Sequence, residues 1–187
     1  MEFTGVKNYP LLELGLSQIY LNRDKINVIE KWFNPEDMSN FIPLPVRDYG
    51  NGKYTLTDGH SRAFVLYKNG FTHVPIVYDD DDMVAGEVGQ KLYREDIKWC
   101  ERFEIVNIAQ LGNRILSGEK YRKLWIERCD KSYNLLMQTT EAERDRIQDK
   151  FPALFLYGAT EDLSELYFEN SHGELFVYKD DIISEHK

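Results

Sequence analysis

The segment from Thr57 to Arg62 contains the residues of this chain whose types and spacing best suit ligand binding and chemistry. It reads Thr-Asp-Gly-His-Ser-Arg, and so brings a carboxylate, an imidazole and a guanidinium together with two hydroxyl groups. The alternation of apolar and polar residues from Tyr54 to Thr57 predicts a half-buried strand, and the apolar run after Arg62 predicts a helix. We expect Asp58 to cap that helix and Gly59 to allow a tight turn before it.

A helix that begins at this point would present unpaired backbone N–H groups and a positive dipole end. Both features suit a phosphate or a carboxylate. The predicted phosphate-binding residues are Thr57, Gly59, His60, Ser61 and Arg62. Among them Arg62 would clamp the negative charge, because its guanidinium offers a fork of donors.

The catalytic candidates are Asp58, as a metal ligand or base, and His60, as a phosphate contact or an acid or base. The pattern leaves one alternative open, which is an ordinary strand-to-helix connection with polar caps. In that case His60 would be a capping or core histidine, and Arg62 would form a structural ion pair with Asp58 or Glu30.

Composition limits the classes of function. The chain has 187 residues, of which 42% are hydrophobic, so it is expected to fold around a core. Its net charge of −9 argues against a surface made mainly to coat DNA or an anionic membrane. No apolar run approaches the length of a membrane span, and the first residues lack the order of a signal peptide. Cys100 and Cys129 lie in helical patterns and are expected to be reduced. We therefore expect a cytoplasmic protein with no membrane partner.

The predicted elements alternate between strands and helices, and the fold class is expected to be α+β. Asn-Gly at 51–52 predicts a hairpin between two of the strands, and Pro75 suggests that the strand containing it lies near an edge or has one unpaired side. Expected strands are 11–16, 44–49, 53–57, 73–78, 153–157, 165–168 and 175–178. Expected helices are 22–33, 60–69, 88–103, 105–111, 118–137 and 141–150. Three parts are expected: a domain of strands and helices at 1–84 that contains the Asp58–Arg62 box, a helical segment at 85–138 and a β-rich extension at 139–187.

Two charged features have both a functional and a plain explanation. The run from Asp79 to Asp82 could bind a metal, although consecutive carboxylates in a loop are more often simply solvated. Residues 91–131 hold ten Lys and Arg against seven Asp and Glu. A short helix, a turn at Gly112 and a longer helix there could form a DNA-binding helix-turn-helix. The alternative is an amphipathic helix pair packed on the core, which Tyr121 and Trp125 favour.

From residue 10 to residue 80, the order of elements resembles the ParB/sulfiredoxin superfamily. The resemblance rests on the hairpin, on the box Asp58-Gly59-His60-Ser61-Arg62, and on the return strand Val74-Pro75-Ile76-Val77 after Gly70. It implies a small mixed sheet with flanking helices, in which a Gly-x-x-Arg box opens a helix over a nucleotide phosphate. The whole chain also resembles a group of bacterial ParB-like proteins, through Trp32-Phe33, Trp99-Cys100 and Leu124-Trp125-Ile126.

The branches of this superfamily differ in chemistry. Sulfiredoxins have a cysteine where His60 stands, so the absence of a thiolate argues against that activity. Of the ParB box that binds CTP, only Gly59 and Arg62 carry over. The free-serine kinase box, which resembles Asp-Gly-His-His-Arg, is the closest match. That branch has an acidic residue, the expected base, in a stretch that corresponds to residues 16–18 of this chain. Here the stretch contains Gln18 in place of an acid, and an amide cannot act as a base. Asp24 or Glu30 could substitute only if its helix directs it at the pocket.

The resemblance thus implies a nucleotide-binding or phosphate-binding ParB-like protein. Its ligand would be ATP or ADP, or CTP, with Mg²⁺ as a further cofactor. It could act as a phosphotransferase on a small-molecule substrate or as a nucleotide hydrolase. The alternative is a non-catalytic ParB-type regulator or DNA-binding protein that a nucleotide switches.

Overall fold

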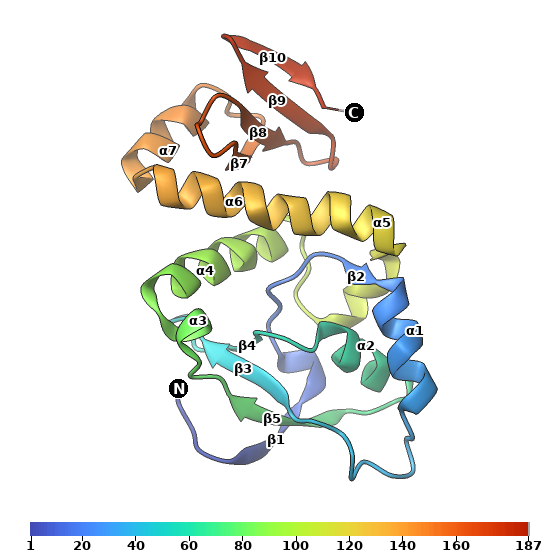
Figure 1. Cartoon of the computed structure of the whole chain (residues 1–187). Coiled ribbons are helices and arrows are strands. Elements are labelled where there is room, and N and C mark those ends of the chain that lie inside the picture. The colour runs from blue at the N-terminus through green and yellow to red at the C-terminus, as the bar shows by residue number, and fades with distance from the viewer. Residues whose placement is uncertain (187) are drawn as a thin grey trace. The chain divides into compact units, whose positions relative to one another are not determined.

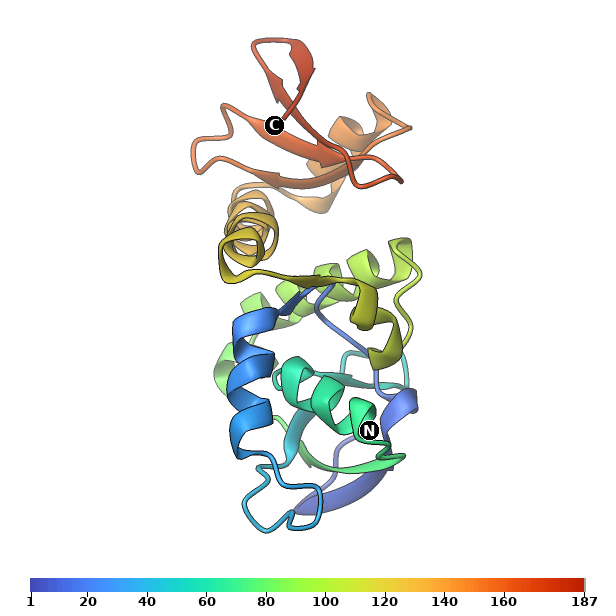
Figure 2. The same ribbon diagram turned by 90° about the vertical axis from the view of Figure 1, so that its right-hand side faces the viewer.

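A computed structural model describes residues 1–186 of the chain and has the expected α+β fold. The chain divides into two compact units, residues 1–121 and residues 122–187, and each is described by itself. Figures 1 and 2 show both units in two views. The helical segment expected at 85–138 is therefore divided between the two units, since the boundary follows Tyr121. Among residues 1–186, no helix combines the length and the apolar character that a membrane crossing requires.

The first unit is built on a mixed four-stranded sheet with the order β1-β5-β3-β4. The strand β1 pairs with β5 antiparallel, β5 with β3 parallel, and β3 with β4 antiparallel through the predicted hairpin. In that hairpin the Asp48 carboxylate accepts hydrogen bonds from the N–H groups of Gly50 and Gly52, both of which have a positive φ. The strands are β1 (Val6–Pro10), β3 (Leu44–Asp48), β4 (Tyr54–Leu56) and β5 (His73–Tyr78).

Two helices of this unit, α1 (Arg23–Trp32) and α2 (His60–Lys68), lie side by side in both views (Figures 1 and 2). Both were predicted from their caps and apolar spacing, and Asn22 caps α1 as expected. Ile26 and Ile29 form the buried face of α1. The remaining elements are η1 (Leu11–Glu13), α3 (Asp82–Ala85), α4 (Glu87–Arg102), η2 (Ile108–Asn113), α5 (Gly118–Tyr121) and the short parallel pair β2 (Leu21–Asn22) and β6 (Ile115–Leu116).

One expectation for this unit is wrong. The apolar run at 11–16 is not the first strand, because β1 ends at Pro10 and the chain then turns through η1, which buries Leu11. The strand β5 lies next to the edge strand β1, and at Pro75 it is paired on the β1 side alone, which agrees with the expectation from Pro75. Its pairing with β3 begins only at Ile76, so the missing N–H of Pro75 falls outside that ladder.

The second unit packs helices on an antiparallel sheet with the order β10-β9-β8-β7. Gly158 lets α6 approach the sheet, since a Cβ there would lie 2.5 Å from the Cβ of Lys131. Three of the strands were predicted, whereas β10 was not, because it is a short exposed strand with no buried face. The elements are the π-helical turn η3 (Arg122–Ile126), α6 (Glu127–Gln138), α7 (Glu141–Asp149), β7 (Phe155–Ala159), β8 (Leu166–Glu169), β9 (Leu175–Lys179) and β10 (Ile182–Glu185).

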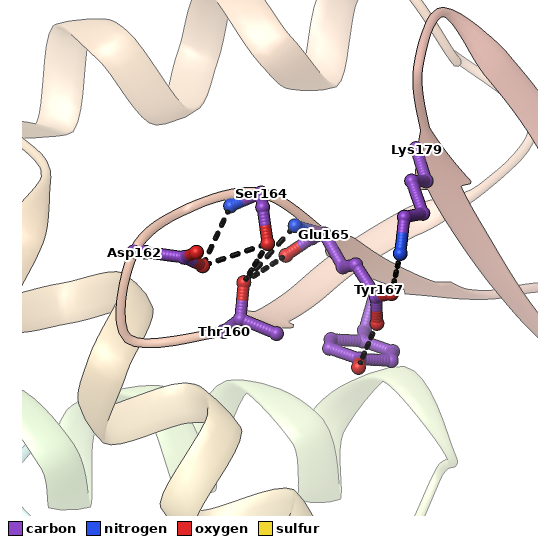
Figure 3. Close-up of polar contacts among 6 residues, drawn as sticks. All are labelled: Thr160, Asp162, Ser164, Glu165, Tyr167 and Lys179. Carbon is purple, nitrogen blue, oxygen red and sulfur yellow. Dashed lines mark hydrogen bonds and ion pairs between the residues drawn. The ribbon is translucent and has the colours of Figure 1, made fainter.

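A network of polar side chains closes the turn between β7 and β8 (Figure 3). The Asp162 carboxylate accepts hydrogen bonds from the N–H and hydroxyl of Ser164, and these bonds lower its pKa to about 2. The Glu165 carboxylate accepts from the Tyr167 hydroxyl at 2.6 Å and pairs with Lys179 at 2.8 Å. Because these groups satisfy one another across the hairpin, the network is structural.

Candidate functional site

A pocket of about 470 Å³ lies in the first unit, and the predicted box forms one of its walls. The first two turns of α1, together with Gln18 and Tyr121, contribute the rest of the lining, so residues far apart in sequence meet here. The lining residues are Gln18, Asp24, Lys25, Val28, Ile29, Asp58, Gly59, His60, Ser61, Arg62 and Tyr121. The structure therefore brings five of the six predicted site residues to one pocket.

The helix α2 begins at this wall without a side-chain cap. Its N-cap is Gly59, with a φ of +81°, and no side chain accepts a hydrogen bond from its first turn. The expectation that Asp58 caps the helix is therefore wrong. In α1, by contrast, the Asn22 side chain accepts from the N–H of Asp24 at 2.8 Å. The first backbone N–H groups of α2 have no such partner, so this end of the helix suits an anion.

His60 is buried, with only 4% of its surface exposed. The backbone N–H of Ser17 donates to its Nε2 at 3.2 Å, which assigns the ring proton of the neutral form to Nδ1. The pKa of His60 falls to about 4, mainly because the ring is buried; the Asp58 carboxylate opposes this shift, and the positive charge of Lys25 adds to it. At neutral pH the imidazole is therefore uncharged. It can donate from Nδ1, but its Nε2 lone pair already accepts a hydrogen bond.

A loop that runs beside β4 holds Ser17 in place. The Ser17 hydroxyl donates to the carbonyl of Leu56 at 2.7 Å, and Gly15 forms a parallel bridge with Thr55. A Cβ at Gly15 would lie 2.7 Å from the Thr55 hydroxyl oxygen, so the close approach requires glycine. Sequence reasoning did not find Ser17. Its contact to His60 uses the backbone and spans 43 positions, and no side-chain pattern signals such a contact.

The other box residues that line the pocket are Ser61, Arg62 and Asp58. Ser61 is only 8% exposed, and its hydroxyl has no hydrogen-bond partner among residues 1–186. The Arg62 guanidinium donates to the carbonyl of Ile42 at 2.7 Å and lies 3.5 Å from the Asp58 carboxylate. Glu30, the other expected partner of Arg62, instead pairs with Lys68 at 2.7 Å.

Thr57 lies apart from the other predicted site residues and does not line the pocket. Its hydroxyl donates to the carboxylate of Asp79, and its carbonyl accepts from the Tyr93 hydroxyl at 2.9 Å. In the aspartate run, Asp79 thus orders the loop, and Asp81 caps α3 by accepting from the N–H of Met83. Within residues 1–186, no three His, Cys, Asp or Glu residues are grouped so that they could hold a metal ion.

Three polar residues outside the box complete the lining. The Gln18 amide donates to the carbonyl of Tyr20, so the residue at the expected acidic position is in the pocket but is neutral. Lys25 is exposed, and neither its ammonium group nor the carboxylate of Asp24 has an ion-pair partner in the described part of the chain. A cation and an acid that are both without a partner therefore stand beside the uncapped start of α2.

No family model and no curated protein matches the sequence. The kind of ligand that the pocket can bind therefore has to be inferred from its own lining residues. Its lining combines the first backbone N–H groups of α2, the Ser61 hydroxyl, two cations and two carboxylates with apolar surface from Val28, Ile29 and Tyr121. Such a pocket can bind a molecule that carries both an anionic group and an apolar or flat ring.

Proposed function

We propose that this protein binds a nucleotide, or a related phosphate ligand, with its phosphate at the start of α2. One observation carries the proposal. The uncapped first turn of α2, with the unpartnered hydroxyl of the largely buried residue Ser61, forms a wall of the pocket. Arg62 in α2 and Lys25 in α1 supply positive charge to the same pocket, beside the carboxylates of Asp58 and Asp24. Backbone N–H groups, a hydroxyl and a guanidinium are the donors that phosphate oxygens require.

The dimensions of the pocket also support a nucleotide. A volume of about 470 Å³ lies within the range of ordinary small-molecule sites, which is about 300–1,000 Å³. Among the lining residues, Tyr121 and Val28 offer apolar surface that would contact the base of the nucleotide. The resemblance of the box to the ParB/sulfiredoxin superfamily supports the same assignment, since Gly59 and Arg62 occupy its Gly-x-x-Arg positions.

The proposal concerns binding, because the residues expected to move a proton are engaged otherwise. The Nε2 of His60 accepts a hydrogen bond from Ser17, Asp58 lies beside Arg62, and Gln18 is neutral. With Nε2 engaged in this way, the neutral His60 ring can act only as a hydrogen-bond donor, from Nδ1. A nucleotide bound here without turnover would make the protein a nucleotide-dependent regulator.

Isothermal titration with ATP, ADP, CTP, GTP and AMP, each with and without Mg²⁺, tests the proposal. We expect at least one nucleotide to bind the wild type. Arg62→Ala and Ser61→Ala should each weaken that nucleotide by about tenfold, because a hydrogen bond to a charged phosphate contributes about 1.5–3 kcal/mol. Lys68→Ala is the matched control, since it removes a cation from the last turn of α2, outside the pocket.

The absence of binding by every nucleotide would refute the proposal. Equal losses in Arg62→Ala and Lys68→Ala would also contradict it, because they would indicate attraction by the overall charge of α2 instead of a defined site. The unliganded melting temperature of each variant shows whether it is folded before titration.

A further inference from the structure

A second cavity lies in the first unit, apart from the pocket at the start of α2. Its lining comes from the loop after η1, from the β3–β4 hairpin and β4, and from α4 with the segment that follows it. Among residues 1–186, none lines both this cavity and the pocket. The volume of the second cavity is about 170 Å³. Since a protein cavity of about 150 Å³ can hold benzene, this one can admit a molecule of about six to eight non-hydrogen atoms.

The hydroxyl of Thr55, in β4, is a buried polar group in the wall of this cavity. Only 1% of the residue's surface is exposed, and its hydroxyl has no hydrogen-bond partner among residues 1–186. Gly15 also lines the cavity and leaves space beside this hydroxyl, since a Cβ at Gly15 would lie 2.7 Å from the oxygen. A buried hydroxyl without a partner is unfavourable, because it has given up its hydrogen bonds to water. A molecule in the cavity that offers a polar group would supply the missing partner.

Most of the remaining lining is apolar. Leu16 and Ile105 are buried, and Ile97 and Val106 add further aliphatic surface. The thiol of Cys100 belongs to the same surface, because burial raises its pKa to about 12 and so keeps it protonated at neutral pH. A ligand of this cavity therefore needs an apolar body as well as one polar group.

The charged side chains of the lining favour a ligand without net charge. Lys53 and Glu101 contribute one charge of each sign, and Asn51 adds a neutral amide. The Lys53 ammonium donates to the carbonyl of Val106 at 3.1 Å, and Glu101 is exposed to solvent. A charged ligand would be attracted by one of the two groups and repelled by the other. A hydroxyl suits the site better, because it can both donate to the Thr55 oxygen and accept from it.

We propose that the second cavity is a binding site for a small neutral molecule with an apolar body and one hydroxyl group, of the size and chemistry of a phenol. The ligand's hydroxyl bonds to Thr55, and its body packs against Leu16, Ile97 and Cys100. This site does not depend on nucleotide binding at the start of α2, so each can fail without the other.

NMR titration of the isotope-labelled protein with phenol, toluene and benzoate tests the proposal. Phenol should bind the wild type with a dissociation constant of about 1 mM or below, and the largest changes in chemical shift should lie at the amides of Leu16 and Cys100. Toluene has the same size but no hydroxyl, and benzoate is charged, so each should bind about threefold weaker or worse. Thr55→Val keeps the shape of the side chain, and it should weaken phenol about fivefold while leaving toluene unchanged. Thr72→Val is the matched control, since it removes an exposed hydroxyl of the same unit outside the cavity.

Four outcomes would overturn the proposal. The absence of phenol binding would show that the cavity holds only water. Toluene or benzoate that binds the wild type as tightly as phenol would exclude the role of the hydroxyl or the preference for a neutral ligand, and this comparison requires no variant. Equal losses of phenol binding in Thr55→Val and Thr72→Val would remove Thr55 from the site. Shift changes centred on residues 58–62 would place phenol in the other pocket. The unliganded melting temperature shows whether each variant is folded.

Discussion

His60 makes the stability of the first unit depend on pH, and His60→Gln isolates this dependence. In the folded chain the ring is buried and accepts a hydrogen bond from the N–H of Ser17. Protonation of Nε2 would break this bond and place a charge in a buried site, which is why the pKa falls to about 4. Glutamine can accept the same hydrogen bond with its side-chain oxygen, and it does not titrate.

The size and sign of the effect follow from the two pKa values. The pKa of His60 is about 6.5 in the unfolded chain and about 4 in the folded one, so below pH 6.5 the unfolded state binds more protons. Stability from this group is fully present above pH 6.5, falls as the pH drops, and is fully lost below about pH 4. The total is about 3 kcal/mol, of which about 2 kcal/mol is lost by pH 5.

Urea unfolding of wild type and His60→Gln at pH 7.5, 6.0 and 5.0 measures this difference directly. Carboxylates also titrate in this range, but they are common to both proteins and cancel in the comparison. We expect the free energy of unfolding of the wild type to fall, relative to His60→Gln, by about 2 kcal/mol between pH 7.5 and 5.0. His73→Gln removes an exposed histidine from the same unit and serves as the control. Parallel curves for wild type and His60→Gln would refute the burial of a neutral His60.

Two further predictions concern stability. Gly59→Ala should destabilise the first unit by about 1–3 kcal/mol more than Gly70→Ala in urea unfolding. Both glycines have a φ of +81°, but only at Gly59 would a Cβ meet Leu44 and Arg62 within 3 Å, so equal losses would show that the wall of the pocket adjusts freely. In the second unit, the buried pair Arg128–Glu169, 2.6 Å apart, predicts that Glu169→Ala costs about 3–5 kcal/mol, because it leaves a buried guanidinium without its counter-charge. Lys179→Ala, at a mostly solvent-screened pair with Glu165, should cost about 1 kcal/mol or less, and similar losses in the two variants would contradict the argument.

The elements that sequence reasoning identified correctly are those that local chemistry determines. The Asn-Gly turn specifies the hairpin, Asn22 and the apolar spacing after it specify α1, and the apolar run after Arg62 specifies α2. The position of the box at the start of α2 follows in the same way. The cap was assigned to the wrong residue, because Asp58 is a good capping residue by type, whereas the left-handed backbone at Gly59 makes glycine the N-cap.

Residues that depend on tertiary contacts could not be found in this way. Ser17 contacts His60 through a backbone N–H group. The Thr57 hydroxyl donates its hydrogen bond to Asp79, 22 positions along the chain, and Thr57 does not line the pocket. Tyr121 was placed in a helical pattern with Trp125 and expected to be in the core. It is buried as expected, yet it also lines the pocket. Apolar spacing predicts burial, but it does not indicate whether a buried ring borders a cavity.

The relative direction of two helices determines whether Asp24 or Glu30 lines the pocket. The two residues are six positions apart on α1, which separates them by about 9 Å along the helix axis. Asp24 lies at the pocket with the first turn of α2, whereas Glu30 pairs with Lys68 in the last turn of α2. The two helices therefore run in the same direction. If α1 ran the opposite way, Glu30 would lie near the box and Asp24 would lie far from it. Helical periodicity places both acids on the helix but does not give its direction relative to α2, so only the fold could select the carboxylate that the ligand meets.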